Sequence, residues 1–192
     1  MKLNLPTKIT LIRIALIPIM VIVYYLSMIP YRSLIAGIIF VVAAGTDFLD
    51  GYLARKNNQV TNLGKFLDPI ADKVLIMTAL FLLVESHTIP VLFGAVSGII
   101  ILARELIVTG FRQIAAANQV VIAADMTGKV KAVFQDIALA FFFLLADLPQ
   151  DAAFTGIFAW ICYILLGIAV VLTIVSGVNY IVRNKQVLSD PQ

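Results

Sequence analysis

The sequence predicts an all-α integral membrane protein built as a bundle of six transmembrane helices. Of its 192 residues, 61% are hydrophobic and 13% are charged, whereas an ordinary soluble domain has roughly 45–50% apolar and about 25% charged residues. The charged residues also gather between long apolar runs, and about 20 apolar residues cross a bilayer as a helix. No polar linker divides these runs, so we expect one domain over residues 1–192.

Six uncharged runs are the candidate spans. They cover 14–31, 33–46, 74–84, 88–103, 137–146 and 152–182. Several are shorter than a bilayer requires, so charged residues must cap or interrupt the ends of those helices. A cleaved signal peptide is not expected, because the first run lacks a small-residue cleavage site and further spans follow.

The basic residues between the runs predict which way the bundle faces. Lys and Arg of short loops stay on the cytoplasmic side of a membrane. When successive loops are assigned to alternate sides of the membrane, 13 of the 14 basic residues fall on one side and only Arg32 falls on the other. Both chain ends are therefore expected in the cytoplasm, with the chain crossing the cell membrane several times. The net charge of +3 then reflects orientation and gives no case for nucleic-acid binding, which needs a basic face with stacking aromatics.

Cysteine and histidine are too scarce for several common kinds of site. The single cysteine, Cys162, excludes an intramolecular disulfide. With only one histidine beside it, the usual zinc chemistries are not expected either. That histidine, His87, falls in an outer loop, where we expect a solvated side chain.

Four of the 11 acidic residues fall within 26 positions and form the most informative pattern in the chain. Asp47 and Asp50 lie three apart at the inner end of the second span, and Asp68 and Asp72 lie four apart at the inner start of the third. Each pair therefore shares one helix face. A short loop joins the two antiparallel helices, so both pairs reach the same depth, where their like charges must be neutralised.

Divalent ions would neutralise such a cluster. Carboxylates without histidine or thiolate suit Mg²⁺ or Mn²⁺, and two ions in one carboxylate site are a recurring device for phosphoryl transfer. Gly51 leaves space for a substrate, Ala54 keeps the next turn narrow, and Arg55 offers a planar donor fork for a phosphate. The alternative is ion pairing with Arg55, Lys65 and Lys73, but cations spread along the sequence do not easily satisfy four converging carboxylates.

Together these residues resemble the signature of a known enzyme family. The segment Asp47-Phe-Leu-Asp50-Gly51-Tyr-Leu-Ala54-Arg55 is followed after eight residues by Gly64-Lys-Phe-Leu-Asp68-Pro-Ile-Ala-Asp72. Every defining position of the CDP-alcohol phosphotransferase signature is filled. The resemblance extends to six spans and cytoplasmic termini, and so covers nearly the whole chain. Residues 4–13 also resemble the short amphipathic N-terminal segment of the family's bacterial phosphatidylglycerophosphate synthases.

The resemblance implies a polar active-site cavity that faces the cytoplasm. There a phosphatidyl group would pass from CDP-diacylglycerol to the hydroxyl of a small alcohol, with release of CMP. By resemblance, the metal ligands for two divalent ions are Asp47, Asp50, Asp68 and Asp72, and Asp72 is also the general base that takes the acceptor's proton. The same analogy gives Gly51, Ala54 and Gly64 the task of making room for the cytidine nucleotide, and Arg55 a contact with its phosphate. Members of the family are commonly homodimers among membrane lipids.

The acceptor is predicted from four further basic residues. An acceptor that carries a phosphate needs positive groups near the metal site, and the candidates are Arg104, Arg112, Lys129 and Lys131. With the resemblance, they favour glycerol 3-phosphate over an uncharged alcohol. Membrane orientation alone also predicts basic residues here, and Arg104 has Glu105 or Asp136 as possible ion-pair partners.

Other functions remain open at this stage. Within the same chemistry, the acceptor alternatives are phosphatidylglycerol, inositol phosphate and serine. A cation transporter also places carboxylates in the membrane, but its site should lie near the midplane between broken helices. A purely structural membrane protein would not concentrate its charge in two facing carboxylate pairs.

Overall fold

The computed structural model describes residues 4–56, 62–117, 126–149 and 153–184, and every regular element in that part of the chain is a helix. The six helices are α1 (Leu5–Tyr25), α2 (Arg32–Lys56), α3 (Asn62–Glu85), α4 (Val91–Ala117), α5 (Met126–Ala146) and α6 (Ala153–Arg183). Each expected span corresponds to one of them. The all-α prediction is therefore confirmed.

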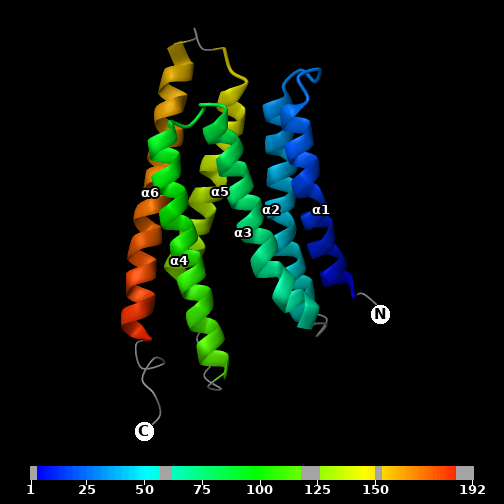
Figure 1. Cartoon of the computed structure of the whole chain (residues 1–192), viewed down its shortest axis with the longest axis vertical. Helices are drawn as coiled ribbons and strands as arrows, with labels where there is room; N and C mark the ends of the chain where they lie inside the picture. The colour runs from blue at the N-terminus through cyan, green and yellow to red at the C-terminus, as the bar shows by residue number, and fades with distance from the viewer. Residues whose placement is uncertain (1–3, 57–61, 118–125, 150–152, 185–192) are drawn as a thin grey trace.

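The helices stand side by side along one long axis (Figure 1). α1 packs on α2 and α3, and α5 lies between α2 and α6. α4 contacts α6 and α3, and so closes the bundle on the other side. The start of α1 and the end of α6 lie at the same end, the lower end in Figure 1, as an even number of antiparallel passes requires.

The first helix begins earlier than its uncharged run. α1 starts at Leu5 and continues without a break through Lys8 and Arg13, so the expected N-terminal amphipathic segment forms the first turns of this helix. A proline lies at its first turn, where the missing N–H costs nothing. The helix ends at Tyr25, and the last residues of the run form a turn in which Tyr31 has a φ of 54°.

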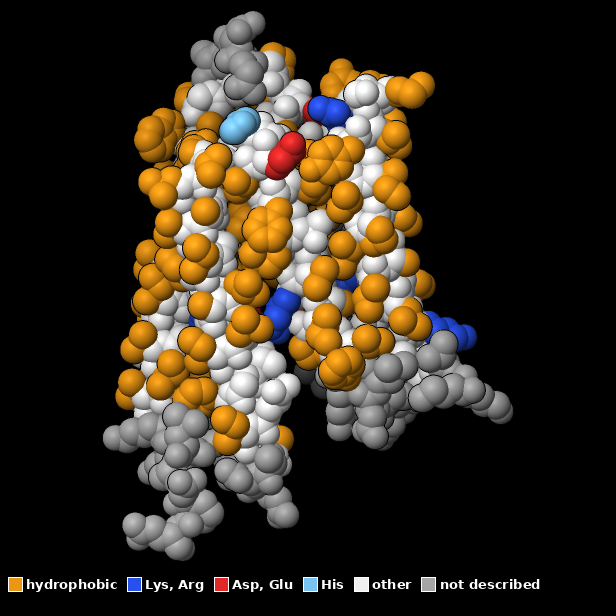
Figure 2. Space-filling view, viewed as in Figure 1, with side chains coloured by type: hydrophobic (Ala, Val, Ile, Leu, Met, Phe, Trp, Pro, Cys, Tyr) orange, Lys and Arg blue, Asp and Glu red, His pale blue; other side chains and the backbone are white. Residues whose placement is uncertain are grey.

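The outer surface of the bundle is apolar, as a protein in lipid requires. Figure 2 shows hydrophobic side chains along the length of the visible helices. Phe81, Ile99 and Trp160 are among the strongly exposed apolar residues of the molecule. Three helices are apolar over enough residues to cross a bilayer: Thr7–Tyr25, Val91–Ala116 and Phe154–Arg183. The chain is therefore a membrane-embedded protein. The apolar part of α2, Arg32–Thr46, is shorter, and α3 and α5 carry charged residues within their length.

Aromatic residues fill the centre of the bundle. Phe40 of α2 and Phe143 of α5 are fully buried with their ring centroids 6.0 Å apart, and Tyr24 of α1 meets Phe143 edge-on at 6.0 Å. Gly37 makes the approach of α2 to α5 possible, because a Cβ built there would lie 2.7 Å from the Cβ of Phe143. The core therefore ties α1, α2 and α5 into one unit.

The separation of α3 and α4 changes along their length. At the upper end, Gly94 and Gly98 of α4 face Val84 and Leu80 of α3, and a Cβ on Gly98 would lie 2.9 Å from a Leu80 methyl group. The small residues of α4 thus pack within the chain. Toward the lower end the two helices diverge (Figure 1), and their facing residues become large and charged.

Candidate active site

A cleft of about 710 Å³ opens between the lower halves of α3 and α4. Figure 2 shows the molecule hollowed in this region. The lining includes two aspartates, three basic residues and one glutamate, namely Asp68, Asp72, Lys73, Arg104, Arg112 and Glu105. Charged groups at membrane depth are costly and usually mark a functional cavity. The cleft is thus the candidate active site.

Two of the four predicted metal ligands lie in this cleft. Asp68 and Asp72 are four residues apart on α3, so they share the face that lines the cleft. The hydroxyl of Thr10 on α1 donates a hydrogen bond of 2.5 Å to Asp68 Oδ1. A hydroxyl that donates to one carboxylate oxygen fixes the orientation of the other.

The first half of the signature is described only by its backbone. Asp47 and Asp50 lie in the last turns of α2, which end at Lys56, and the chain resumes as helix at Asn62. The side chains of residues 47–56 lie outside the described residues, and so do the predicted roles of Gly51, Ala54 and Arg55. Gly64 is buried near the start of α3.

α1 turns a polar stripe toward the aspartates. Thr7, Thr10 and Arg13 recur every three residues and are 2%, 1% and 0% exposed. Arg13 Nε donates to Thr46 Oγ1 at 3.1 Å, and that hydroxyl donates to the Ala43 carbonyl at 2.6 Å. Thr46 is the residue before Asp47, so α1 supplies a buried positive charge beside the start of the acidic signature.

A second polar cluster surrounds Glu105 on α4. Lys131 Nζ and Arg104 Nη1 lie 2.8 Å and 3.0 Å from Glu105 Oε1, and Lys73 Nζ lies 3.9 Å from Oε2. Lys73 also donates to the Pro69 carbonyl at 3.0 Å. The ion pair considered between Arg104 and Glu105 is therefore present. It is part of a group that also includes cations from α3 and α5.

The four predicted acceptor-binding cations occupy different positions. Arg104 and Arg112 line the cleft with Asp68 and Asp72, and Lys131 reaches its border through Glu105. The Arg112 guanidinium lies 5.7 Å from the centre of the Tyr180 ring, in a cation–π contact. Lys129 is exposed and is not part of the cleft lining.

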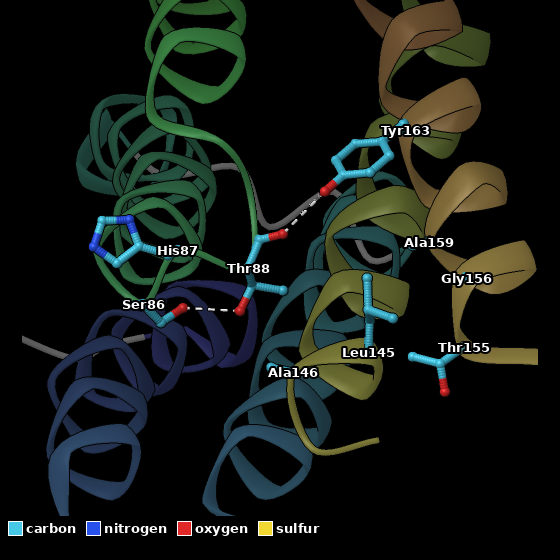
Figure 3. Close-up of a pocket in the computed structure, with 9 residues that line it drawn as sticks. All are labelled: Ser86, His87, Thr88, Leu145, Ala146, Thr155, Gly156, Ala159 and Tyr163. Atoms are coloured by element: carbon cyan, nitrogen blue, oxygen red, sulfur yellow. Dashed lines mark hydrogen bonds between the residues drawn. The ribbon is translucent and has the colours of Figure 1, made fainter. Parts of the chain in front are cut away.

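Another cavity, at the upper end of the bundle, has different chemistry (Figure 3). It measures about 420 Å³ and lies between the loop after α3 and the facing ends of α5 and α6. Its hydroxyls are engaged with one another and with backbone: Ser86 Oγ lies 2.9 Å from Thr88 Oγ1, and Thr155 donates to the Pro149 carbonyl at 2.7 Å. Its described lining holds no carboxylate and no lysine or arginine, and the His87 ring projects away from α6. The lower cleft, and not this cavity, therefore has the charged groups that metal-assisted phosphate chemistry needs.

Comparison with known proteins agrees with the family that the signature resembles. The family model of the CDP-alcohol phosphatidyltransferases matches residues 3–175. The chain belongs to this family. Members of the CDP-alcohol phosphatidyltransferase family generally use a divalent metal ion.

Relatives are similar over nearly their full length. A protein of Bacillus subtilis is 42% identical, with 96% of this chain and 97% of the relative covered. A Haemophilus influenzae protein is 39% identical over 99% and 98%, and an Escherichia coli protein is 38% identical over 94% of each. All three are named CDP-diacylglycerol–glycerol-3-phosphate 3-phosphatidyltransferase.

The residues of the cleft fit the family's metal requirement in their donor chemistry. Asp68 and Asp72 present carboxylate oxygens, the ligands that Mg²⁺ and Mn²⁺ prefer. The side chains that the structure describes form no group of three or more acidic, histidine or cysteine residues. Asp47 and Asp50 lie outside that set. The described half of the site is therefore compatible with a divalent ion.

Three residues at the site were not predicted. Glu105 appeared only as an alternative partner of Arg104, Lys73 only as a possible ion-pair partner of the aspartates, and no partner was predicted for Thr10. The i, i+3 recurrence of Thr7, Thr10 and Arg13 was the available signal for a polar face on α1. For Glu105 the signal was its position, an acidic residue inside an otherwise apolar run.

Proposed function

We propose that this protein transfers the phosphatidyl group of CDP-diacylglycerol to glycerol 3-phosphate, giving phosphatidylglycerophosphate and CMP in phospholipid biosynthesis. The observation that carries the proposal is the cleft itself, where two signature aspartates and two arginines share one space. Full-length relatives that bear the name of this activity support it. We also propose that residues 1–192 form one domain.

We propose Asp47, Asp50, Asp68 and Asp72 as the ligands of two divalent ions, Mg²⁺ or Mn²⁺. When bound, these ions neutralise the pyrophosphate and stabilise the charge that develops on the departing CMP. Two of the carboxylates, on Asp68 and Asp72, border the cleft. Thr10 holds Asp68 in one orientation through its hydrogen bond. Gly51, Ala54 and Gly64 leave room for the cytidine nucleotide, and Arg55 contacts its phosphate.

Asp72 is the general base of the proposed reaction. Its carboxylate takes the proton from the acceptor hydroxyl, and the hydroxyl oxygen forms a bond to the lipid-side phosphorus of CDP-diacylglycerol. The bond from that phosphorus to the CMP oxygen breaks, and CMP leaves with the bonding electrons. The products are the phosphatidylated alcohol, CMP and the proton held on Asp72.

Positive charge on the α4 side of the cleft supports a phosphorylated acceptor. Arg104 and Arg112 line the cleft together with the aspartates. Lys131, which is paired with Glu105, places a third positive charge at the border of the cleft. Guanidinium groups bind phosphate through paired, charge-assisted hydrogen bonds. Lys129, exposed on the neighbouring turn of α5, contributes at most long-range attraction. The alternative acceptors, which the assay compares, are phosphatidylglycerol, inositol phosphate and serine.

The proposal includes a topology. All six helices span the cell membrane, and both termini and the cleft face the cytoplasm. The start of α1 and the end of α6 lie at the end of the bundle that carries the cleft (Figure 1), and basic residues dominate that end in the sequence. Labelling of single introduced cysteines with a membrane-impermeant reagent, on a Cys162→Ser background, tests this topology.

A homodimer is proposed from the family resemblance, and light scattering in detergent measures the oligomeric state.

The test of the proposed function is release of CMP by the purified protein in micelles of CDP-diacylglycerol with Mg²⁺ or Mn²⁺. The acceptors compared are glycerol 3-phosphate, inositol phosphate, serine and phosphatidylglycerol. We expect release that depends on glycerol 3-phosphate and on the metal. Release with a different acceptor would retain the metal site and reject the acceptor assignment, and no release with any of them would reject the function.

A further inference from the structure

One carboxylate, Glu105, is surrounded by basic side chains from three helices. Lys131 of α5 and Arg104 of α4 share its Oε1, at 2.8 Å and 3.0 Å, and Lys73 of α3 lies 3.9 Å from Oε2. The side chains of this group, which we name the Glu105 cluster, are only 3% to 20% exposed. The cluster therefore joins three helices at the border of the cleft.

The charges of the Glu105 cluster do not cancel. Three cations and one carboxylate leave two positive charges in excess. Cations held this close in a partly buried site repel one another, and the Glu105 carboxylate lies within ion-pair distance of all three. Without its charge the basic groups would move apart. The carboxylate is therefore what keeps them together.

The Arg104 side chain packs closely against two glycine positions on neighbouring helices. A Cβ on Gly177 of α6 would lie 3.0 Å from Arg104 Cγ, and one on Gly128 of α5 would lie 3.0 Å from Arg104 Nη2. The Nε of Arg104 is buried without a hydrogen-bond partner among the described residues. A buried donor without a partner costs free energy.

We propose that Glu105 is a positioning residue that holds Lys73, Arg104 and Lys131 as a preformed receptor for the phosphate of the acceptor. Glu105 offsets one positive charge, and the remaining two match a phosphate monoester dianion. The cluster thereby selects a phosphorylated alcohol over a neutral one. This inference rests on the proposed function and adds to it the element that sets acceptor selectivity.

The deciding variant is Glu105→Gln, which keeps the size of the side chain and removes its charge. The measurements are KM for glycerol 3-phosphate, KM for CDP-diacylglycerol, and the preference for glycerol 3-phosphate over glycerol. We expect KM for glycerol 3-phosphate to rise about tenfold or more, KM for CDP-diacylglycerol to change less than about twofold, and the preference to fall. Glu105→Asp restores the charge and should recover part of the loss.

Glu85→Gln is the matched control, because Glu85 is exposed at the upper end of α3. It should leave both KM values unchanged. A rise in both KM values to the same degree in Glu105→Gln, or an unchanged or lower KM for glycerol 3-phosphate, would overturn the inference. If Glu105→Gln does not purify as a folded protein, Lys131→Gln carries the test, because Lys131 makes the shortest ion pair of the cluster. A KM for glycerol 3-phosphate equal to wild type in Lys131→Gln would then overturn the inference.

Failure of the proposed function gives a different result. A wild-type protein that releases no CMP with glycerol 3-phosphate rejects that function. Calorimetric titration of wild type and Glu105→Gln with inorganic phosphate still tests the cluster. We expect wild type to bind phosphate about tenfold more tightly than the variant, and equal binding would reject Glu105 as the residue that forms the receptor.

Discussion

Thr10 on the first helix donates a 2.5 Å hydrogen bond to Asp68 on the third, across 58 positions of sequence. Thr10 is 1% exposed and Asp68 is half-buried at the cleft, so the bond joins a buried helix face to the cleft wall. A group that hydrogen-bonds to a metal ligand without touching the metal itself fixes the orientation of that ligand. Removing such a group typically weakens metal binding about 10- to 100-fold. The N-terminal helix is thus part of the candidate active site.

Thr10→Val should lower the affinity for the metal ion and leave the shape of the cleft unchanged. Valine keeps the shape of threonine but cannot donate, so Asp68 loses its fixed orientation. We expect the Mg²⁺ or Mn²⁺ concentration for half-maximal CMP release to rise roughly 10-fold or more. Binding of Mn²⁺, followed by the loss of its free paramagnetic signal, should weaken in parallel. Thr155→Val, which removes a buried hydroxyl at the opposite end, is the control and should change neither value.

Asp72→Asn should stop turnover while the nucleotide still binds. The amide cannot accept the acceptor's proton, so the reaction loses its base, whereas the nucleotide pocket keeps its other contacts. We expect the rate of CMP release to fall by about 100-fold or more, with CDP-diacylglycerol binding by calorimetry reduced much less. Asp68→Ala should differ from it by weakening metal-dependent binding. Full turnover in Asp72→Asn would refute the base assignment.

The sequence predicted the elements that depend on local pattern. Apolar runs and their charged ends predicted six helices, and the four-residue spacing placed Asp68 and Asp72 on one face of α3. These features follow from helix geometry alone, because residues four apart lie on the same side. The six-span topology and the positions of the Asp47 and Asp50 side chains stay predictions.

Contacts between helices could not be predicted in the same way. Which neighbour meets Thr10 or Glu105 depends on how the helices pack, and one sequence without its fold does not specify that. Lys129 and Lys131 illustrate the limit. Both are basic and two positions apart, yet Lys131 is 3% exposed against Glu105 while Lys129 is exposed, because residues two apart point to different sides of a helix.

Gly177→Ala should disturb the acceptor site through Arg104. The added methyl would press on Arg104 Cγ, which belongs to the stem of the side chain and not to its flexible end. We expect KM for glycerol 3-phosphate to rise by about three- to tenfold, because small displacements of a positioning group are costly. KM for CDP-diacylglycerol should stay nearly constant.

Gly167→Ala is the matched control on the same helix, because a Cβ at Gly167 meets nothing within 4 Å. It should leave both KM values as in wild type. The same KM for glycerol 3-phosphate in the two variants would show that the stem of Arg104 moves freely, and the close contact at Gly177 would then have no functional role.

Gly94→Ala tests the contact that sets where α3 and α4 begin to separate. A methyl group at Gly94 would overlap a methyl of Val84 and lie 3.2 Å from Ile89 Cγ2. Val84 is β-branched and has little freedom to rotate away. Overpacking of this kind costs about 1–3 kcal/mol of stability, so we expect the unfolding temperature in detergent to fall by roughly 3–10 °C.

The control for this contact lies on the same helix. A Cβ at Gly110 would meet nothing within 4 Å, so Gly110→Ala should leave the unfolding temperature unchanged or raise it slightly, since alanine favours helix over glycine. If both variants melt at the wild-type temperature, the upper ends of α3 and α4 can move apart freely. The width of the cleft would then not depend on the glycines of α4, and α3 and α4 would have to be held by the Glu105 cluster instead.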